Sequence, residues 1–348
     1  MRPLKFLALP AMAAGLLGCR ETPKQEEEPQ EPMHQTVYLE VGKLEVASEA
    51  FYDLVPRDAR LEVLAENHEW TEGPLWIEDG NYLLYSDIPE NTVYRWSEND
   101  GVRQYLKPSG FTGTDFKGAE PGSNGLLLDP EGHLVLCQHG DRRIVRMASQ
   151  LSRPETVFET LAEAYGGKRL NSPNDAVFHS SGSLFFTDPP YGLPGQMDDP
   201  EKELDFQGVY RRTPEGEVQL LTDELSRPNG IAFSPDETVL YVANSDPERA
   251  IWMAYDVLED GRLGPGRIFH DATTRTASEK GLPDGLKVHS SGALFATGPG
   301  GVFVFGSDGA VLGRILTGQA TANCAFNADE SVLYITADAY LLRLPLNQ

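Results

Sequence analysis

PNGIAF, residues 228 to 233, is one instance of a phrase that recurs along the chain, and its repetition decides the fold. An Asn-Gly pair between apolar residues is ordinarily the strongest short-range sign of a β-hairpin turn. Related phrases, each with a polar residue just before an apolar run, mark six positions. They are Glu72 in TEGPLW, Asn124 in SNGLLL, Asn174 in PNDAVF, Asn229 in PNGIAF, Asp284 in PDGLKV and Asn323 in ANCAF. The intervals between them are 52, 50, 55, 55 and 39 residues.

A period close to 50 residues, with several short strands in each unit, is typical of a β-propeller. In every unit a turn follows the marked residue by five to eight positions, and a second apolar strand follows that turn. The turns read IEDG, DPEG, HSSG, SPDE, HSSG and ADES. The hairpin turn of each unit is therefore already assigned, and the marked residue is expected to stand just before the first strand.

The sequence thus predicts an all-β fold, a six-bladed β-propeller of four-stranded antiparallel blades over residues 37–348. The last unit has 25 residues after Asn323, which is enough for three strands. RLEVLA (Arg60–Ala65) lies upstream of the first unit and is expected to supply the missing outer strand. An N-terminal strand in that place closes the ring and removes open sheet edges.

The first strand of each blade lies innermost in a propeller, so the six marked residues are expected to face the central channel at one depth. Each of them carries a side-chain oxygen, and two are carboxylates. Asn and Asp also favour turn-like backbone at strand entrances, which is the structural alternative. Six converging oxygens suit a hard cation such as Ca²⁺. The chain contains no HExxH and no paired CxxC motif, which disfavours a zinc site.

Composition limits the partners. The chain has 53 Asp and Glu against 29 Lys and Arg, for a net charge of −24, which argues against nucleic-acid binding. It contains no GxSxG elbow, no Walker A motif and no dinucleotide fingerprint after a strand. Nothing in the sequence indicates an obligate protein partner.

Five phrases carry a family resemblance: WTEGPLW, NSPNDAVF, RPNGIAF, LPDGL and LFFTDPPYG. With them, residues 50 to 345 resemble the regucalcin/gluconolactonase family, which includes senescence marker protein and luciferin-regenerating enzyme. The resemblance implies a six-bladed propeller with one divalent cation in the channel, usually Ca²⁺, with Mg²⁺, Mn²⁺ or Zn²⁺ as substitutes. It also implies a hydrolase that opens lactones, here sugar lactones such as gluconolactone.

Carried over position by position, the resemblance makes Glu72, Asn174, Asn229 and Asp284 the metal ligands, and all four residue types match the family pattern. Asn124 and Asn323 share the ring without belonging to the four, and we expect them to hold water or substrate. A bound cation polarises the lactone carbonyl and stabilises the oxyanion that forms when water adds.

Water needs a base, and the resemblance assigns this role to Asp284. A carboxylate bound to a cation is a weakened base, so a neighbouring residue that is not a ligand is the alternative. Residues about 15 positions after the marked ones are expected near the channel mouth: Asp87, His139, Asn244 and Asp338. Histidine is the residue type that titrates near neutrality, which makes His139 a second catalytic candidate. The alternative for His139 is a structural histidine that fixes a loop.

One loop is unusually long. Residues 188–208 (DPPYGLPGQMDDPEKELDFQG) connect the second and third strands of the third unit, where other units use only a few residues. A long Gly- and Pro-containing loop on the channel face is expected to act as a lid, with Tyr191 in contact with substrate. A tolerated insertion is the alternative.

The N-terminus predicts export. Residues 1–19 combine a basic start with a short apolar core that ends in LLGC, which resembles the lipobox of bacterial lipoproteins. Cys19 would then be the lipid anchor, and the protein would face the periplasm or the cell exterior, with that anchor as its only membrane contact. An ordinary cleaved secretory signal is the alternative. Residues 20–36 are acidic and Pro-rich and are expected to form a flexible tether.

Two other functions remain open at this point. An open cation site also suits a phosphotriesterase, because the same ion polarises a phosphoryl oxygen. A non-catalytic, ligand-binding propeller with a structural ion is the other interpretation.

Overall fold

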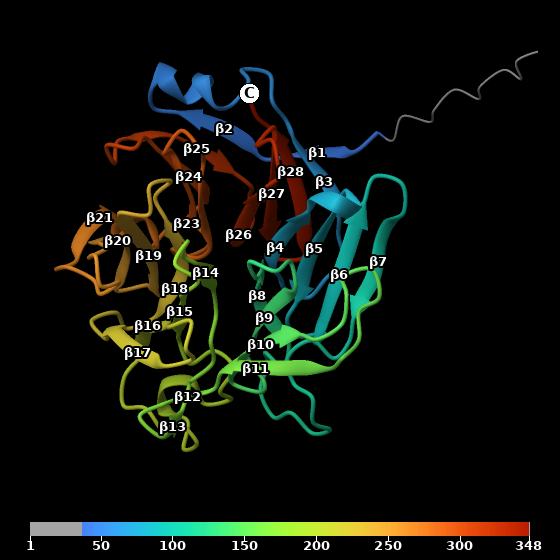
Figure 1. Ribbon diagram of the computed structural model, residues 1–348. Coiled ribbons are helices and arrows are strands. Elements are labelled where there is room, and N and C mark those ends of the chain that lie inside the picture. Colours follow the sequence, from blue (N-terminus) through green and yellow to red (C-terminus); the bar gives the residue numbers. More distant parts are fainter. Residues whose placement is uncertain (1–36, 348) are drawn as a thin grey trace, which may run out of the picture. The chain divides into compact units, whose positions relative to one another are not determined.

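Six antiparallel sheets form a closed ring in the computed structural model, which describes residues 37–347 (Figure 1). The predicted six-bladed propeller is therefore confirmed. The predicted signal segment, the tether and Cys19 lie outside the described residues. No helix within residues 37–347 has the length and apolar character needed to span a membrane.

Blades 1 to 4 run outward from the channel in chain order. Blade 1 is β4 (Thr71–Ile77), β5 (Tyr82–Asp87), β6 (Thr92–Ser97) and β7 (Gly101–Leu106), and blade 2 is β8 (Ser123–Leu128), β9 (Leu134–Gln138), β10 (Arg143–Met147) and β11 (Phe158–Ala162). Blade 3 is β14 (Ala176–Phe178), β15 (Leu184–Asp188), β16 (Gly208–Arg212) and β17 (Val218–Thr222), and blade 4 is β18 (Pro228–Phe233), β19 (Val239–Asp246), β20 (Arg249–Asp256) and β21 (Arg267–Asp271).

Blade 5 is β22 (Leu286–Val288), β23 (Leu294–Gly298), β24 (Gly301–Phe305) and β25 (Val311–Leu316), extended by β2 (Lys43–Val46). Blade 6 is β26 (Thr321–Phe326), β27 (Val332–Ala337) and β28 (Tyr340–Pro345), extended by β3 (Leu61–Ala65) and β1 (Leu39–Val41). Short elements complete the fold: the ribbon β12 (Ala164–Tyr165) and β13 (Lys168–Arg169), and the 3₁₀ turns η1 (Glu49–Asp53), η2 (Glu78–Gly80), η3 (Gln196–Asp198) and η4 (Thr273–Arg275).

The N-terminal segment closes the ring as predicted, because β3 pairs with β28 through Val63 opposite Leu342. The segment does more than the sequence indicated. Strand β1 adds a fifth strand to blade 6, and β2 pairs with β25 of blade 5. The expectation of four strands in every blade is therefore wrong for these two. The extra strands cover outer edges that would otherwise present unpaired backbone groups.

The core consists of six apolar clusters, each lying between two neighbouring blades. Consecutive strand residues point to opposite faces of a sheet and therefore into different clusters. In blade 1, Leu83 packs toward blade 6 while Leu84 packs toward blade 2. In blade 3, Phe185 packs toward blade 4 and Phe186 toward blade 2. Both faces of each blade are buried, which holds the inner strands in a fixed position around the channel.

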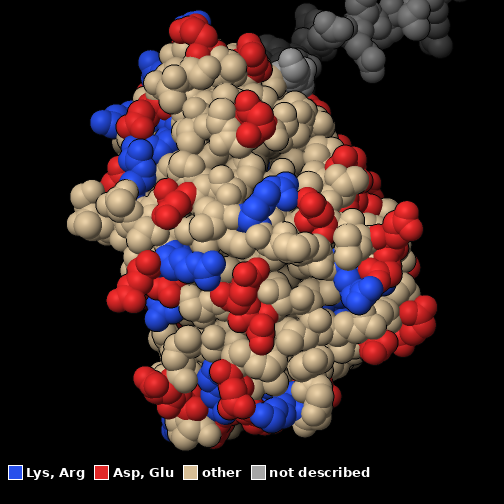
Figure 2. Space-filling model, turned by 90° about the vertical axis from the view of Figure 1, so that its left-hand side faces the viewer, with Lys and Arg blue, Asp and Glu red and all other residues tan. Residues whose placement is uncertain are grey.

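The outer side of the ring near β17 and β21 carries Lys and Arg interspersed with Asp and Glu (Figure 2). On this face the basic residues do not gather into a patch.

The marked residues sit within the first strands rather than just before them in four of the six blades. Glu72, Asn124, Asn229 and Asn323 lie inside β4, β8, β18 and β26, and the expectation is wrong for these four. In each case the pairing with the second strand shifts register at this point. A bulge re-aims a side chain and releases backbone groups from the ladder. The bulges therefore let the marked side chains turn toward the channel.

The glycine of PNGIAF serves blade packing and not a hairpin turn. A Cβ atom at Gly230 would lie 2.3 Å from the carbonyl oxygen of Asp284 in the next blade. The same holds at Gly73 and Gly125, whose Cβ atoms would lie 2.2 Å and 2.8 Å from the carbonyl oxygens of Asn124 and Asn174. A residue without a side chain is needed because neighbouring inner strands approach so closely here.

Gly230→Ala is expected to lower the free energy of unfolding by about 1–3 kcal/mol, because the added methyl group overlaps backbone that cannot move independently. Chemical denaturation measures the change. Gly264→Ala is the matched control, since its nearest neighbours would lie at an ordinary 3.6 Å. Equal stability of the two variants would contradict the close packing of the inner strands.

Candidate functional site

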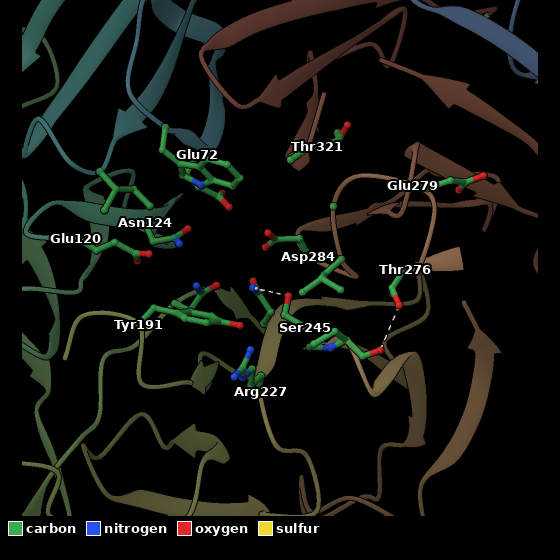
Figure 3. Close-up of a pocket in the computed structure, with 18 residues that line it drawn as sticks. Glu72, Glu120, Asn124, Tyr191, Arg227, Ser245, Thr276, Glu279, Asp284 and Thr321 are labelled. Carbon is green, nitrogen blue, oxygen red and sulfur yellow. Dashed lines mark hydrogen bonds between the residues drawn. The ribbon is translucent and has the colours of Figure 1, made fainter. Parts of the chain in front are cut away.

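A cavity of about 470 Å³ lies at one end of the channel. It is lined by five of the six marked residues: Glu72, Asn124, Asn174, Asn229 and Asp284. Figure 3 shows the carboxylates of Glu72 and Asp284 pointing into the same central space from different blades. The volume suits a sugar-sized ligand, since small-molecule pockets usually span about 300–1,000 Å³.

Glu72 is buried, and one of its carboxylate oxygens is already engaged. Oε2 accepts hydrogen bonds from the backbone N–H of Gly73 at 2.8 Å and from Nδ2 of Asn323 at 3.1 Å. These two donors orient the carboxylate and leave Oε1 for a ligand in the cavity. Burial raises the pKa of Glu72 to about 7, with smaller increases from the charges of Asp175 and then Glu120.

Asn229 is oriented by Ser245. Nδ2 of Asn229 donates to Oγ of Ser245 at 3.1 Å, and that hydroxyl in turn donates to the carbonyl oxygen of Pro283. With the amide nitrogen occupied in this way, the amide oxygen of Asn229 is free for the cavity. Both Asn229 and Ser245 come from blade 4, so the geometry of this ligand is set within one sheet.

Asp284 carries the strongest electrostatic signal in the cavity. Burial, followed by the negative charges of Glu72, Asp175 and Glu120, raises the pKa of Asp284 well above its ordinary range. Its Oδ1 is buried and accepts no hydrogen bond within residues 37–347. The buried Oδ1 of Asn124 is in the same situation. Unpaired acceptors beside mutually repelling carboxylates are costly unless a cation balances them.

The set of donors therefore fits a hard divalent cation. Two carboxylates and two amides, from Glu72, Asp284, Asn174 and Asn229, line one cavity and offer only oxygen ligands. Ca²⁺ prefers this chemistry. Asn323, predicted to hold water or substrate, instead donates to Glu72 and is not among the residues that line the cavity.

The paired carboxylates imply a pH dependence. Because their folded pKa values lie above the unfolded ones, Glu72 and Asp284 stabilise the metal-free protein most below about pH 4, and this contribution is lost as the pH rises toward 7 and beyond. With chelator, the melting temperature is expected to fall between pH 5 and pH 8. Saturating Ca²⁺ should reduce that fall. Scanning calorimetry with both buffers tests this, and parallel curves would contradict it.

His139 lies behind the cavity wall and does not line it. Its side chain is fully buried, and Nδ1 is 2.9 Å from Oε2 of Glu120, which does line the cavity. Its Nε2 is buried without a hydrogen-bond partner in the described part of the chain. A direct contact of His139 with substrate is therefore not supported by this arrangement, whereas a role through Glu120 is sterically available.

The other residues expected near the channel mouth hold backbone in place. Asp87 accepts hydrogen bonds from the N–H groups of Glu69 and Trp70 at 3.1 Å and 3.2 Å. Asn244 accepts from the N–H of Arg227 at 2.8 Å. Neither residue lines the cavity, and Asp338 does not line it either. The side chains of Asp87 and Asn244 position the segments that lead into the inner strands, whereas Asp338 acts through its carbonyl oxygen, which accepts from the N–H of Thr71 at 2.9 Å.

The long loop between β15 and β16 reaches the cavity, where Tyr191 forms part of the wall (Figure 3). Ser172 pins the loop: its Oγ donates to the carbonyl oxygen of Pro189 at 2.7 Å and accepts from the N–H of Gly192 at 2.8 Å. Burial and the negative charge of Asp284 raise the pKa of Tyr191, so its hydroxyl stays protonated. Contact of Tyr191 with substrate remains a prediction.

Sequence reasoning missed several wall residues. Trp70, Arg227, Leu282 and Thr321 each lie two positions before a marked residue, and all four line the cavity. Side chains two apart in an extended chain share a face, so the register could have identified them. Glu120 had no such signal, because it lies in the irregular segment between β7 and β8.

A second group that could hold a metal lies in the turn between β8 and β9. Asp129, Glu131 and His133 place one ligand atom each within 4.8 Å of one another. The carboxylate of Asp129 already accepts hydrogen bonds from the N–H groups of Glu131 and His133 and is ion-paired with Arg146. The turn lies at the opposite end of β8 from Asn124, and none of the three residues lines the channel cavity.

Comparison with known proteins shows which family the chain resembles. Residues 70–339 match the family described as SMP-30/Gluconolactonase/LRE-like region. A gluconolactonase from Zymomonas mobilis subsp. mobilis is 37% identical over 310 residues, covering 87% of this chain and 86% of the relative.

Two solved structures are similar as well. A gluconolactonase from Xanthomonas campestris has a TM-score of 0.77 and 34% identity, covering 91% of this chain and 99% of that one. A calcium-binding protein, regucalcin, from Agrobacterium tumefaciens has a TM-score of 0.63 at 20% identity and covers 81% and 92%. At that identity the second likeness supports the fold alone.

Proposed function

The chain belongs to the SMP-30/gluconolactonase/LRE-like family, and from this membership we propose that it is a metal-dependent hydrolase of sugar lactones. The observation that carries the proposal is the convergence of Glu72, Asn174, Asn229 and Asp284 on one sugar-sized cavity, with Oδ1 of Asp284 left unpaired. These four residues would hold one divalent cation, for which Ca²⁺ fits best.

A cation bound there supplies a Lewis acid for the lactone carbonyl. The protein supplies the rest. Asn124 and Tyr191 line the cavity beside the ligands and are proposed to contact the sugar ring. Asn323 keeps Glu72 in place through its hydrogen bond to Oε2. In the reaction, water adds to the carbonyl carbon, the bond to the ring oxygen breaks, and that oxygen leaves as a hydroxyl.

We assign the base to Glu120 ahead of Asp284. Asp284 was the candidate from family resemblance, but a carboxylate that ligates a cation is a weakened base. Glu120 lines the same cavity, is not one of the four ligand positions, and is held by the His139 imidazole at 2.9 Å. The negative charge of Glu120 contributes to the raised pKa values of both Glu72 and Asp284, because Glu120 lies near these two carboxylates. His139 is then a positioning residue.

The test is lactone opening by chelator-treated protein, followed with a pH indicator, with and without added Ca²⁺. D-glucono-1,5-lactone is the substrate, and paraoxon is the comparison for phosphotriesterase activity. Ca²⁺-dependent opening of the lactone is the expected result. A Ca²⁺-dependent rise in melting temperature with no lactone turnover would overturn the hydrolase and favour a binding propeller with a structural ion.

Export remains a separate proposal. Residues 1–19 would direct the chain out of the cytoplasm, with Cys19 as lipid anchor and residues 20–36 as tether. These residues lie outside the described part of the structure.

A further inference from the structure

Arg227 is the cation in the cavity wall. It is one of the four wall residues that stand two positions before a marked residue: Trp70, Arg227, Leu282 and Thr321. Of these four only Arg227 is ionisable, and among the residues that the structure describes no Lys and no other Arg lines the cavity. Figure 3 shows Arg227 beside Tyr191 and Ser245, across the cavity from Glu72.

The backbone of Arg227 is fixed by the second strand of its own blade. Its N–H donates to Oδ1 of Asn244 at 2.8 Å, and its carbonyl oxygen accepts from the N–H of Ser245 at 2.9 Å. Asn244 is fully buried and donates in turn to the carbonyl oxygen of Arg249 at 2.8 Å. The side chain of Arg227 is therefore directed to the cavity by the sheet, on the same face as Asn229.

The guanidinium of Arg227 makes no hydrogen bond or ion pair with any residue in the range 37–347. The nearby acids are engaged with other groups. Asp246, on which the charge of Arg227 acts, accepts hydrogen bonds from Oγ of Ser226 at 2.5 Å and from the N–H of Glu248 at 2.9 Å. Glu279 is held by Arg275 at 3.2 Å and by Arg314 at 2.6 Å, and Glu120 is held by His139. A partly buried guanidinium with free N–H groups is suited to an anionic ligand.

We propose that Arg227 binds a carboxylate that the substrate carries in addition to its lactone group, so that the preferred substrates are monolactones of sugar diacids. This inference rests on the proposed function. The lactone carbonyl would lie at the four-ligand end, the ring against Trp70 and Leu282, and the free carboxylate at Arg227. A guanidinium binds a carboxylate with two parallel N–H···O hydrogen bonds.

Charge favours a carboxylate over a phosphate. Glu72, Glu120 and Asp284 line the same cavity, and one cation already balances the metal ligands in the proposed complex. A monoanionic group meets one guanidinium, whereas a dianionic phosphate would retain a net negative charge facing Glu120. A carboxylate and a phosphate would both bind a guanidinium as anions, and the calorimetric experiment below distinguishes them.

The kinetic test compares two lactones that differ only at C6: D-glucaro-1,4-lactone, which carries a carboxylate, and D-glucono-1,4-lactone, which carries a hydroxymethyl group. Wild-type protein is expected to show the higher kcat/KM for the acidic lactone. In Arg227→Met the ratio of kcat/KM, acidic over neutral, should fall about 10- to 100-fold, chiefly through KM of the acidic lactone. Arg227→Lys keeps the positive charge but cannot donate two parallel hydrogen bonds, so it should recover part of the ratio.

Arg249→Met is the matched control, because it removes the same charge from an exposed position of the same blade. Its ratio is expected to equal that of wild type. If Arg227→Met lowers kcat/KM equally for both lactones, and does so through kcat, the proposal is overturned and Arg227 has a role in the reaction step. A wild-type preference for the neutral lactone would also overturn it.

Calorimetry separates failure of this inference from failure of the proposed function. With Ca²⁺ present, glucarate is expected to bind wild type at least about tenfold more tightly than gluconate, and Arg227→Met should remove the difference. If wild type opens neither lactone, the proposed function fails while this binding difference still tests Arg227. Tighter binding of 6-phosphogluconate than glucarate, lost in Arg227→Met, would replace the carboxylate by a phosphate. No difference among the three acids would overturn the anion site.

Discussion

Asp284→Asn is expected to have opposite effects on the protein with and without cation. In chelator at pH 8 the variant should melt at a higher temperature than wild type, because the charged form of Asp284 is disfavoured by burial and by Glu72. With saturating Ca²⁺ the melting temperature of the variant should not rise. Turnover of lactone should fall by about 10³-fold, since a charged ligand is lost.

The control is Glu131→Gln, in the turn that holds the second group of candidate ligands. It removes one negative charge from an exposed position, and both the Ca²⁺-induced rise in melting temperature and the turnover should match wild type. If Glu131→Gln loses the Ca²⁺ response and Asp284→Asn keeps it, the cation belongs to the turn and not to the channel.

Glu120→Gln should separate chemistry from metal binding. The variant keeps all four proposed ligands, so the Ca²⁺-induced rise in melting temperature should remain. Its kcat is expected to fall by about 10²–10³-fold, the usual contribution of a positioned base. Calorimetric melting and initial-rate kinetics on the same preparation give both quantities.

Asp115→Asn is the matched control for Glu120→Gln, because Asp115 lies in the same loop and is exposed, where it pairs with Lys117. Its kcat should equal that of wild type. A Glu120→Gln variant with normal kcat would return the role of base to Asp284. Loss of the Ca²⁺ response in that variant would make Glu120 a ligand.

Much of the fold could be predicted because a propeller repeats. Each unit has the same order of marked residue, apolar strand, turn and apolar strand. Because the order occurs six times, it can be recognised even where one unit departs from it. The closing strand Arg60–Ala65 followed from the short last unit. Strands β1 and β2 had no equivalent in the repeat, and their pairing with blades 6 and 5 depends on where the N-terminal segment meets the finished ring.

The candidate site likewise contains residues that the repeat predicted and residues that it did not. Residues in register with the repeat could be placed in advance: Glu72, Asn124, Asn174, Asn229 and Asp284 all line the cavity. Asn323 is in register too, yet it turns to Glu72, because a neighbouring carboxylate was available to its amide. His139 lies one residue beyond β9, where it is covered by Glu120.

By itself the sequence determined the six-fold repeat, the ring of oxygen-bearing side chains and the position of the long loop, because these depend on local spacing along the strands. The tertiary structure alone decided which of those oxygens remain unpaired and which wall residues join them. Glu120 comes from an irregular segment. Within residues 37–347 the guanidinium of Arg227 has no hydrogen-bond or ion-pair partner, and Glu279 and Glu120 are bound by other residues. Such pairing depends on contacts between blades that are distant in the chain, and no local pattern encodes them.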